Sequence, residues 1–236
     1  MSYYITPTIE WCESVTHGFA VSKYINQFAN TISNLAFIIF PCIQYVYNKQ
    51  HKLYIPYEIH YCNITICIVG ICSAWFHSQN TFISELADEF SMICLMAMYS
   101  YISTDLTNRI CENIFHRHYT LIVSCLWMCF ITTKQFIFFT NCILFQLMFP
   151  IYNIYLIESR DNKINNINKN KKHTVLNIFI IFIIAAKICW FYERYLYANN
   201  NCPIYSPLFY LHSLWHIFTA ISHIAVIQYC IFAYNN

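Results

Sequence analysis

The sequence predicts an all-α integral membrane protein, a single bundle of seven transmembrane helices formed by residues 1–236. Of the 236 residues, 58% are hydrophobic, 19% are aromatic and only 10% are charged. A soluble domain has about 25% charged residues. The apolar residues also fall in runs of roughly 20, the length that a helix needs to cross a bilayer. The solvent around this chain is therefore lipid.

Seven apolar runs account for the bundle, with polar stretches between them. Only Thr132-Thr133-Lys134 separates the fourth run from the fifth, so this boundary is the weakest. The chain has two glycines, so aromatic and isoleucine-rich faces, rather than close contacts between small residues, are expected to join the helices. The predicted helices are 30–47, 57–76, 86–104, 118–133, 135–156, 174–196 and 207–233.

Two polar segments flank these helices. Residues 1–29 lack the apolar core of a cleavable signal peptide, so the first membrane helix is expected to direct insertion. Residues 157–173 are rich in Asn and Lys, a composition typical of a solvated, mobile connection. The sequon Asn63-Ile-Thr65 falls inside the second helix and is expected to be unused.

Basic residues predict the orientation in the membrane. The loops after the first, third and fifth helices hold nine of the 13 Lys and Arg, whereas the even-numbered loops have Lys134 and little else. Because basic loops stay on the cytosolic side, we expect a luminal N-terminus and a cytosolic C-terminus, in the endoplasmic reticulum or Golgi. The nine residues are Lys49, Lys52, Arg109, Arg117, Arg160, Lys163, Lys169, Lys171 and Lys172.

The remaining composition excludes several other classes. A formal net charge of +2 without a basic and aromatic array argues against nucleic-acid binding. Most of the 13 cysteines lie inside apolar runs, where Cys behaves as a small hydrophobic residue, and no C-x-x-C pair indicates a zinc finger or redox motif. The cysteines at or near segment ends are Cys12, Cys111, Cys189 and Cys202.

Three histidines stand out at the predicted luminal ends of helices. His77 ends the second helix, while His212 and His216 open the seventh and share one face because they are four residues apart. Ser73 lies one turn before His77, and Asp88 opens the third helix. Three imidazoles, a carboxylate and a hydroxyl meet the needs of a catalytic zinc ion with an open fourth position.

Other histidines fit simpler interpretations. A single His at a helix end is usually an interfacial side chain. His223 lies near the face of His216 but deeper in the seventh helix, so we interpret it as a packed residue. The histidines on loops or helix ends are His17, His51, His60, His116, His118 and His173.

These motifs resemble the alkaline ceramidase family. That family opens with a W-C-E triplet and a Y-I-x-E-F-x-N-T-x-S-N run, and two histidine-bearing blocks follow. The matching stretches here are Trp11-Cys12-Glu13, Tyr24-Ile25, Phe28-Ala29-Asn30-Thr31-Ile32-Ser33-Asn34, Ser73-Ala-Trp-Phe-His77, Leu86-Ala-Asp88-Glu89 and His212-Ser-Leu-Trp-His216.

The resemblance implies a seven-helix zinc amidase that cleaves ceramide, a lipid substrate in the membrane, to a sphingoid base and a fatty acid. His77, His212 and His216 would hold Zn²⁺. Asp88 would transfer the proton of the attacking water to the leaving amine, and Ser73 would donate a hydrogen bond to the developing oxyanion.

Bland alternatives stay open for these two polar residues. Ser73 is also a plausible packing residue whose hydroxyl bonds back to its own helix. Glu85 and Glu89 flank Asp88, and each can be interpreted as a solvated acid near a helix N-terminus that interacts favourably with the helix dipole. Asp88 is preferred because its spacing from His77 matches the family and because charges within a bilayer are usually paired or functional.

The resemblance also implies a calcium site in the N-terminal segment. Its candidate ligands are Glu10, the Trp11 carbonyl, Glu13 and Gln27. Gln27 replaces a family glutamate and Gly18 a family asparagine, so the loss of oxygen ligands and charge predicts weaker calcium binding. In this family the cysteine of the triplet pairs with a second luminal cysteine, so the resemblance implies a disulfide of Cys12 with either Cys189 or Cys202.

Two other functions remain in competition. A related seven-helix lipid hydrolase or an adiponectin-receptor-like protein would share the three-histidine pattern, but not the W-C-E and N-T-x-S-N elements. A receptor or transporter without catalysis would share the helices, but would make the H-x-x-x-H pair and Asp88 coincidental.

The orientation is testable with epitope tags in sealed microsomes. A tag after Asn236 should be digested by added protease, because the C-terminus is expected on the cytosolic side, and a tag after Ser2 should be protected. Protection of the C-terminal tag together with digestion of the N-terminal one would reverse the predicted orientation.

Overall fold

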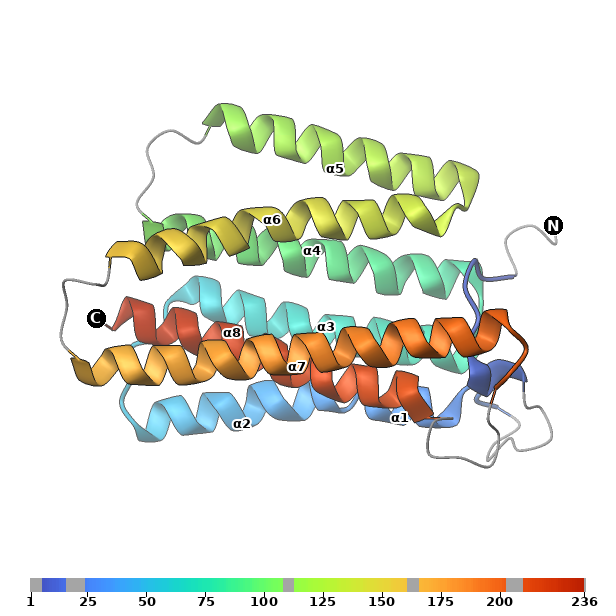
Figure 1. Ribbon diagram of the computed structural model, residues 1–236, viewed down its shortest axis with the longest axis horizontal. Helices are drawn as coiled ribbons and strands as arrows, with labels where there is room; N and C mark the ends of the chain where they lie inside the picture. The colour runs from blue at the N-terminus through green and yellow to red at the C-terminus, as the bar shows by residue number, and fades with distance from the viewer. Residues whose placement is uncertain (1–5, 16–23, 108–112, 161–165, 203–209, 236) are drawn as a thin grey trace.

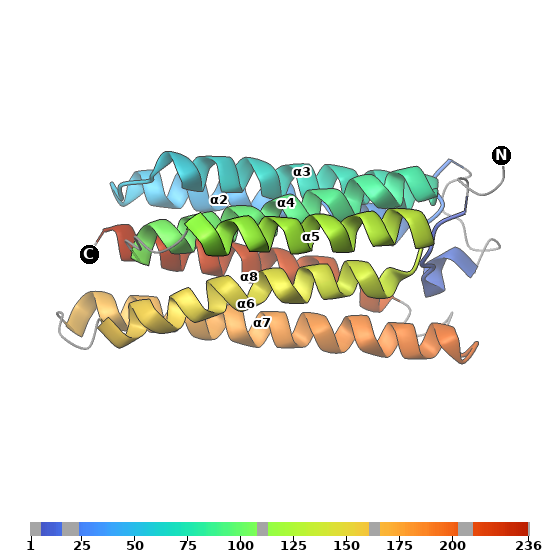
Figure 2. The same cartoon turned by 90° about the horizontal axis from the view of Figure 1, so that it is seen from above.

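The computed structural model is a bundle of long helices that run nearly parallel or antiparallel to one another (Figures 1 and 2). It describes residues 6–15, 24–107, 113–160, 166–202 and 210–235, and this part of the chain contains no β-strand. The elements are a 3₁₀ helix η2 (Cys12–Val15), α1 (Phe28–Ser33), α2 (Ala36–Gln50), α3 (Tyr57–Gln79), α4 (Phe82–Thr107), α5 (Asn113–Thr133), α6 (Phe136–Arg160), α7 (Asn166–Ala198) and α8 (Leu211–Tyr234).

Among the residues that the structure describes, five segments are long and apolar enough to cross a membrane. They are Phe28–Gln50, Tyr57–Gln79, Phe136–Glu158, Asn170–Ala198 and Leu211–Tyr234. Large apolar side chains also cover the outer surface, as on α7, where Ile181 and Ile188 are each 63% exposed. The prediction of an all-α, multi-pass membrane protein is thereby confirmed. The count of seven crossings, which would need α4 and α5 as well, stays a prediction.

The first predicted helix, 30–47, is divided in the structure into α1 and α2. Side chains before the break bond to backbone carbonyls, since Ser33 Oγ and Asn34 Nδ2 both donate to the Asn30 carbonyl, at 2.9 and 2.8 Å. Such local bonds compete with the regular helical ladder and favour helix ends. The break falls at Asn34 and Leu35, and the short α1 lies beside the start of α2 at one end of the bundle (Figure 1).

The predicted loop 157–173 was wrong over most of its length. In the structure α6 continues to Arg160 and α7 begins at Asn166, and residues 161–165 lie outside the described part. Residues 159–173 contain neither Gly nor Pro, and Lys is a good helix former. A contact between Glu158 and His173, with 3.3 Å between Oε2 and Nε2, also joins the two helices there.

The short boundary between the fourth and fifth predicted helices is confirmed. Lys134 adopts a left-handed backbone conformation with φ of 55°. Its N–H donates to the Phe130 carbonyl at 2.8 Å, which closes the last turn of α5. Phe136 then begins α6, so α5 and α6 form an antiparallel pair.

The helix α8 is the centre of the bundle. In the apolar stretch of α8, 61% of the residues are buried, against 6% in that of α7. α7 packs along α8 on one side and faces outward on the other. α2 also packs on α8. Elsewhere in the bundle, α4 packs against both α3 and α6. The start of α8 therefore meets the end of α3 and the N-terminal segment at one end of the molecule, which positions the site described below.

Gly70 allows α3 to approach the α1–α2 break closely. A β-carbon at this position would lie 2.7 Å from Phe37 Cβ and 3.1 Å from the Asn34 carbonyl oxygen. The expectation that small-residue contacts play no part in helix association was therefore wrong at this position.

The substitution Gly70→Ala is expected to destabilise the protein. Alanine favours a helix by about 1 kcal/mol, but overpacking of a tight contact costs about 1–3 kcal/mol, so the midpoint of thermal unfolding in detergent should fall. The matched control is Ile71→Ala, at a neighbouring position that is 58% exposed, and it should shift the midpoint less. A higher midpoint for Gly70→Ala would show that the two helices do not approach so closely.

Candidate metal centre

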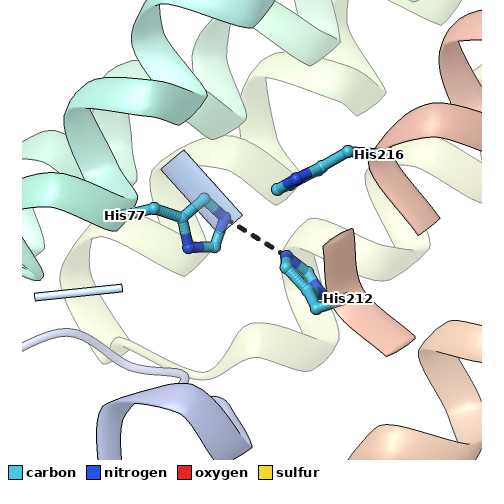
Figure 3. A group of neighbouring side chains, drawn as sticks. All are labelled: His77, His212 and His216. Atoms are coloured by element: carbon cyan, nitrogen blue, oxygen red, sulfur yellow. Dashed lines mark hydrogen bonds between the residues drawn. The ribbon is translucent and has the colours of Figure 1, made fainter. Parts of the chain in front are cut away.

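Three buried histidines converge at one end of the bundle. His77 comes from the last turns of α3, while His212 and His216 come from the first turns of α8. One ring nitrogen from each lies within 4.8 Å of the others, and the Nε2 atoms of His77 and His212 are 3.2 Å apart (Figure 3). Imidazole nitrogens around a tetrahedral ion with bonds of about 2.0–2.1 Å are separated by roughly 3.3 Å. The spacing of the His77 and His212 nitrogens therefore fits two ligands of a tetrahedral metal ion, and the third imidazole lies close enough to complete the set.

The local helical structure determines the backbone position of each of the three histidines. His212 and His216 are one turn apart on α8, which brings both rings to one face. α3 ends just beyond His77, at Asn80, whose left-handed conformation with φ of 50° closes the helix through a bond to the Phe76 carbonyl. The N-terminal segment covers this end, because the Gln27 N–H donates to the His77 carbonyl at 3.0 Å.

Each histidine has a polar group beside its other ring nitrogen. Gln27 Oε1 lies 2.7 Å from His77 Nδ1, and Ser33 Oγ lies 2.7 Å from His216 Nδ1. A metal-binding His usually uses its second nitrogen in this way, which fixes the tautomer and the ring orientation. With Nδ1 so engaged, Nε2 of His77 and of His216 is left for the centre, and His216 Nε2 is buried without a hydrogen-bond partner among the described residues.

Glu193 on α7 lies beside the third histidine, beyond hydrogen-bond distance, and was missed in the sequence. Its Oε2 lies 3.9 Å from His212 Nδ1, and its Oε1 accepts the Cys12 N–H at 3.2 Å. The carboxylate is fully buried. The available signal was a Glu inside the apolar run 174–196, because a carboxylate at such depth is usually paired or functional.

A disulfide holds the N-terminal segment over the same histidine. Cys12 is joined to Cys202, with 5.3 Å between their Cα atoms, which resolves the open choice between Cys189 and Cys202. The neighbouring Trp11 stacks on His212 with 3.7 Å between ring centroids. The segment thus covers the centre with an aromatic ring and excludes water from one side.

Ser73 and Asp88 lie together although they come from different helices. Both are buried, Ser73 one turn before His77 on α3 and Asp88 in the second turn of α4, and their side chains are hydrogen-bonded to each other. Asp88 Oδ1 has no hydrogen-bond partner among the described residues, and Asp88 does not belong to the cluster of three possible ligands. This arrangement suits a carboxylate that acts beside a metal rather than on it.

The neighbouring acids are used differently. Glu85 accepts hydrogen bonds from both the N–H, at 2.6 Å, and the hydroxyl of Thr8, so it ties the N-terminal segment to α4. Glu89 is buried with neither carboxylate oxygen hydrogen-bonded among the described residues. His223 lies deeper on α8, where its Nδ1 is 2.9 Å from the Tyr99 hydroxyl, outside the three-histidine cluster.

The candidate calcium ligands all have other partners. Glu10 accepts from Tyr197, Glu13 from the Ala29 and Asn30 N–H groups, and Gln27 from His77 or Asn30. The Trp11 carbonyl accepts from Ser14. Burial raises the pKa of Glu13, while its backbone donors act in the opposite direction. These oxygens hold the N-terminal segment together, and the calcium site stays a prediction.

The fold and this cluster define a class of protein. A multi-pass helical bundle with three buried imidazoles at one end has the donor set of an intramembrane metalloenzyme. The Nε2 atom of His216, which has no hydrogen-bond partner among the described residues, is one of these donors.

Sequence comparisons give the family. A sequence model of the family "Ceramidase" matches residues 3–236, and the chain belongs to this family of hydrolases. Human "Alkaline ceramidase 1" is 24% identical over 93% of this chain and 80% of its own length. The Dictyostelium discoideum "Putative alkaline ceramidase dcd3A" is 24% identical over 97% and 87%. The Drosophila melanogaster "Alkaline ceramidase" is 30% identical over 39% of this chain and 32% of its own length.

Removing one ligand should remove the metal. His212→Ala and His216→Ala are each expected to abolish both bound metal and activity, because two imidazoles hold a transition-metal ion far less tightly than three. Metal content of the purified protein, measured by atomic emission, checks this result. His223→Ala, a buried histidine outside the cluster, is the matched control and should retain most metal. Stoichiometric metal in both single variants would exclude these two residues as ligands.

Proposed function

We propose that the protein hydrolyses the amide bond of ceramide with a zinc ion held by His77, His212 and His216, and releases a sphingoid base and a free fatty acid. The observation that carries this proposal is the convergence of three buried imidazoles, each with a polar group beside Nδ1, inside a membrane bundle. Three imidazoles leave a fourth tetrahedral position open, as a catalytic zinc site requires. Family membership supplies the substrate class.

Bound zinc would supply a Lewis acid that polarises the amide carbonyl and lowers the pKa of water toward 7. The residues of the chain then divide the remaining work. Asp88 accepts the proton of the attacking water and delivers it to the leaving nitrogen. Ser73, hydrogen-bonded to Asp88, orients that carboxyl group while it is ionised. Once Asp88 has taken up the proton, the single hydroxyl proton of Ser73 can be donated to the developing oxyanion. Gln27, Ser33 and Glu193 keep the three imidazoles in place.

A cavity between α4, α6, α7 and α8 provides the place for alkyl chains. We call it the lipid chamber. It begins beside the metal centre at Trp215, the neighbour of His216, and at Thr219, and its other walls include Leu95, Ile154 and Phe179. The mostly apolar lining suits a two-chain lipid whose amide lies at the centre and whose chains extend into the bundle.

The proposal includes seven crossings, with the metal centre on the luminal side. The described N-terminal segment and the end of α8 lie at opposite ends of the bundle (Figure 1), as an odd number of crossings requires. The Cys12–Cys202 disulfide lies at the metal end, and disulfides persist in the secretory lumen but rarely in the cytosol. Calcium, in this proposal, has a weaker effect than the family resemblance implies.

The competing functions make different predictions for the same assay. Purified protein should contain one zinc per chain and release fatty acid from ceramide, but not from a diacyl phospholipid of matched chains. Zinc with phospholipid cleavage alone would favour a different lipid hydrolase. A folded protein without zinc and without turnover would favour a receptor or transporter.

Asp88→Asn should separate proton transfer from metal binding. The variant keeps the shape of the side chain but cannot accept a proton, so zinc should remain bound while turnover falls by roughly 10²–10⁴-fold. Zinc content and single-turnover hydrolysis of ceramide measure the two effects. Glu89→Gln, one residue further on, is the control and should be far milder.

Two results would contradict the role of Asp88. Loss of zinc from Asp88→Asn would make the carboxylate a ligand or its essential support. Near-normal turnover with zinc bound would make it structural, and Glu85 would then be tested as the base.

A further inference from the structure

The lipid chamber contains one side chain that its apolar lining does not explain. Lys187, on α7, is the only Lys, Arg, Asp or Glu among the described residues that line the chamber. It lies 11 residues before Ala198, the end of α7, which corresponds to about 16 Å along the helix. A charged Lys at such depth in a bilayer is energetically unfavourable, and ionisable residues within a membrane are usually paired or mark a functional site.

The protein offers Lys187 no negative charge. No carboxylate in the described part of the chain forms an ion pair with it. Glu193, on the same helix, uses one oxygen for the Cys12 N–H and directs the other toward His212. The recorded contact of Lys187 Nζ is with the ring of Trp190, at 5.8 Å from the centroid. The side chain is exposed, so its ammonium is accessible to a ligand.

The chamber places this ammonium on the path of a lipid. Trp215 and Thr219 line the chamber at the metal end, and His223 lines it one further turn along α8. Lys187 lines the same chamber from α7 and interacts electrostatically with His223. A lipid that leaves the metal centre along the chamber therefore passes the ammonium.

The chemistry of the reaction, which this inference takes from the proposed function, indicates the anion. Hydrolysis breaks the amide C–N bond, forms a C–O bond from water, and leaves a carboxylate and a protonated amine without any redox change. Ceramide itself is uncharged. A negative charge thus appears in the chamber only when the fatty acid is released.

We propose that Lys187 binds the carboxylate of the fatty acid product within the lipid chamber. The alkyl chain of the acid lies against the apolar lining, and the ammonium of the sphingoid base is repelled by the like charge. Lys187 therefore discriminates product from substrate, and retains the acid after the base has left. The class of ligand is a long-chain carboxylate.

Direct binding of a fatty acid tests the proposal without turnover. The probes are cis-parinaric acid and its methyl ester, which have the same chain but differ in charge, and binding is followed by energy transfer from tryptophan in a nonionic detergent. Wild-type protein should bind the acid more tightly than the ester. Lys187→Met should weaken binding of the acid by about tenfold to a hundredfold, the range for a charge-assisted hydrogen bond, and leave the ester within about twofold.

Matched variants separate charge from packing. Lys187→Arg should keep the preference for the acid, and Lys187→Gln should lose it. Lys171→Met, on the same helix but lining a different cavity, should behave as wild type. An unfolding transition checks that each variant is folded.

Several results would overturn the proposal. In wild type, these are equal binding of acid and ester, or no saturable binding of either probe. In Lys187→Met, they are an equal loss of binding of both probes, or an unchanged preference for the acid. The last result is expected if the metal centre alone holds the carboxylate. The assay needs no hydrolysis, so the proposed function can fail while the acid preference stands, and the reverse.

Discussion

The inward direction of three imidazole Nε2 atoms is the constraint on which the rest of the structure depends. Three neutral rings with their acceptor nitrogens together have no favourable interaction of their own. Each ring therefore has a polar side chain beside its Nδ1 atom. These side chains are Gln27, Ser33 and, at a longer distance, Glu193. These residues come from the N-terminal segment, α1 and α7, so the centre forms only when elements far apart in the chain have packed.

The N-terminal segment has a structural role of corresponding weight. It is attached to α4 through Thr8 and Glu85, to α1 through Glu13, and to the segment after α7 through the Cys12–Cys202 disulfide. Trp11 consequently stacks on His212. Polar oxygens that a calcium ion would prefer are used here as hydrogen-bond acceptors, which explains how the segment is ordered by the protein's own contacts.

The position of the centre at one end of the bundle suits chemistry on a membrane lipid. Water and a proton acceptor are needed at the amide, whereas the chains need an apolar environment. The metal cluster and Asp88 meet the first need near the helix ends, and the chamber between α4, α6, α7 and α8 meets the second. Buried α8 joins the two, because its first turns supply His212 and His216 and its next turns line the chamber.

The sequence by itself determined the fold class, most helix ranges, the three histidines and the family, because these depend on local runs and spacings. Apolar length predicts helices in lipid, and i, i+4 spacing brings two imidazoles to one face. The helix boundary at Lys134 could also be predicted from the sequence, since a polar triplet interrupts an apolar run. Continuation of α6 and α7 into the Asn- and Lys-rich stretch was not, because composition alone did not distinguish a solvated helix from a loop.

Only the tertiary structure decided which groups face the centre. Glu193 and Gln27 are far from His212 and His77 in the chain, and no local pattern records that their side chains meet. The same holds for Cys12 and Cys202, for the tight approach at Gly70, and for the position of Lys187 in the chamber. Each depends on how helices cross, and a crossing is a property of packed pairs rather than of either helix alone.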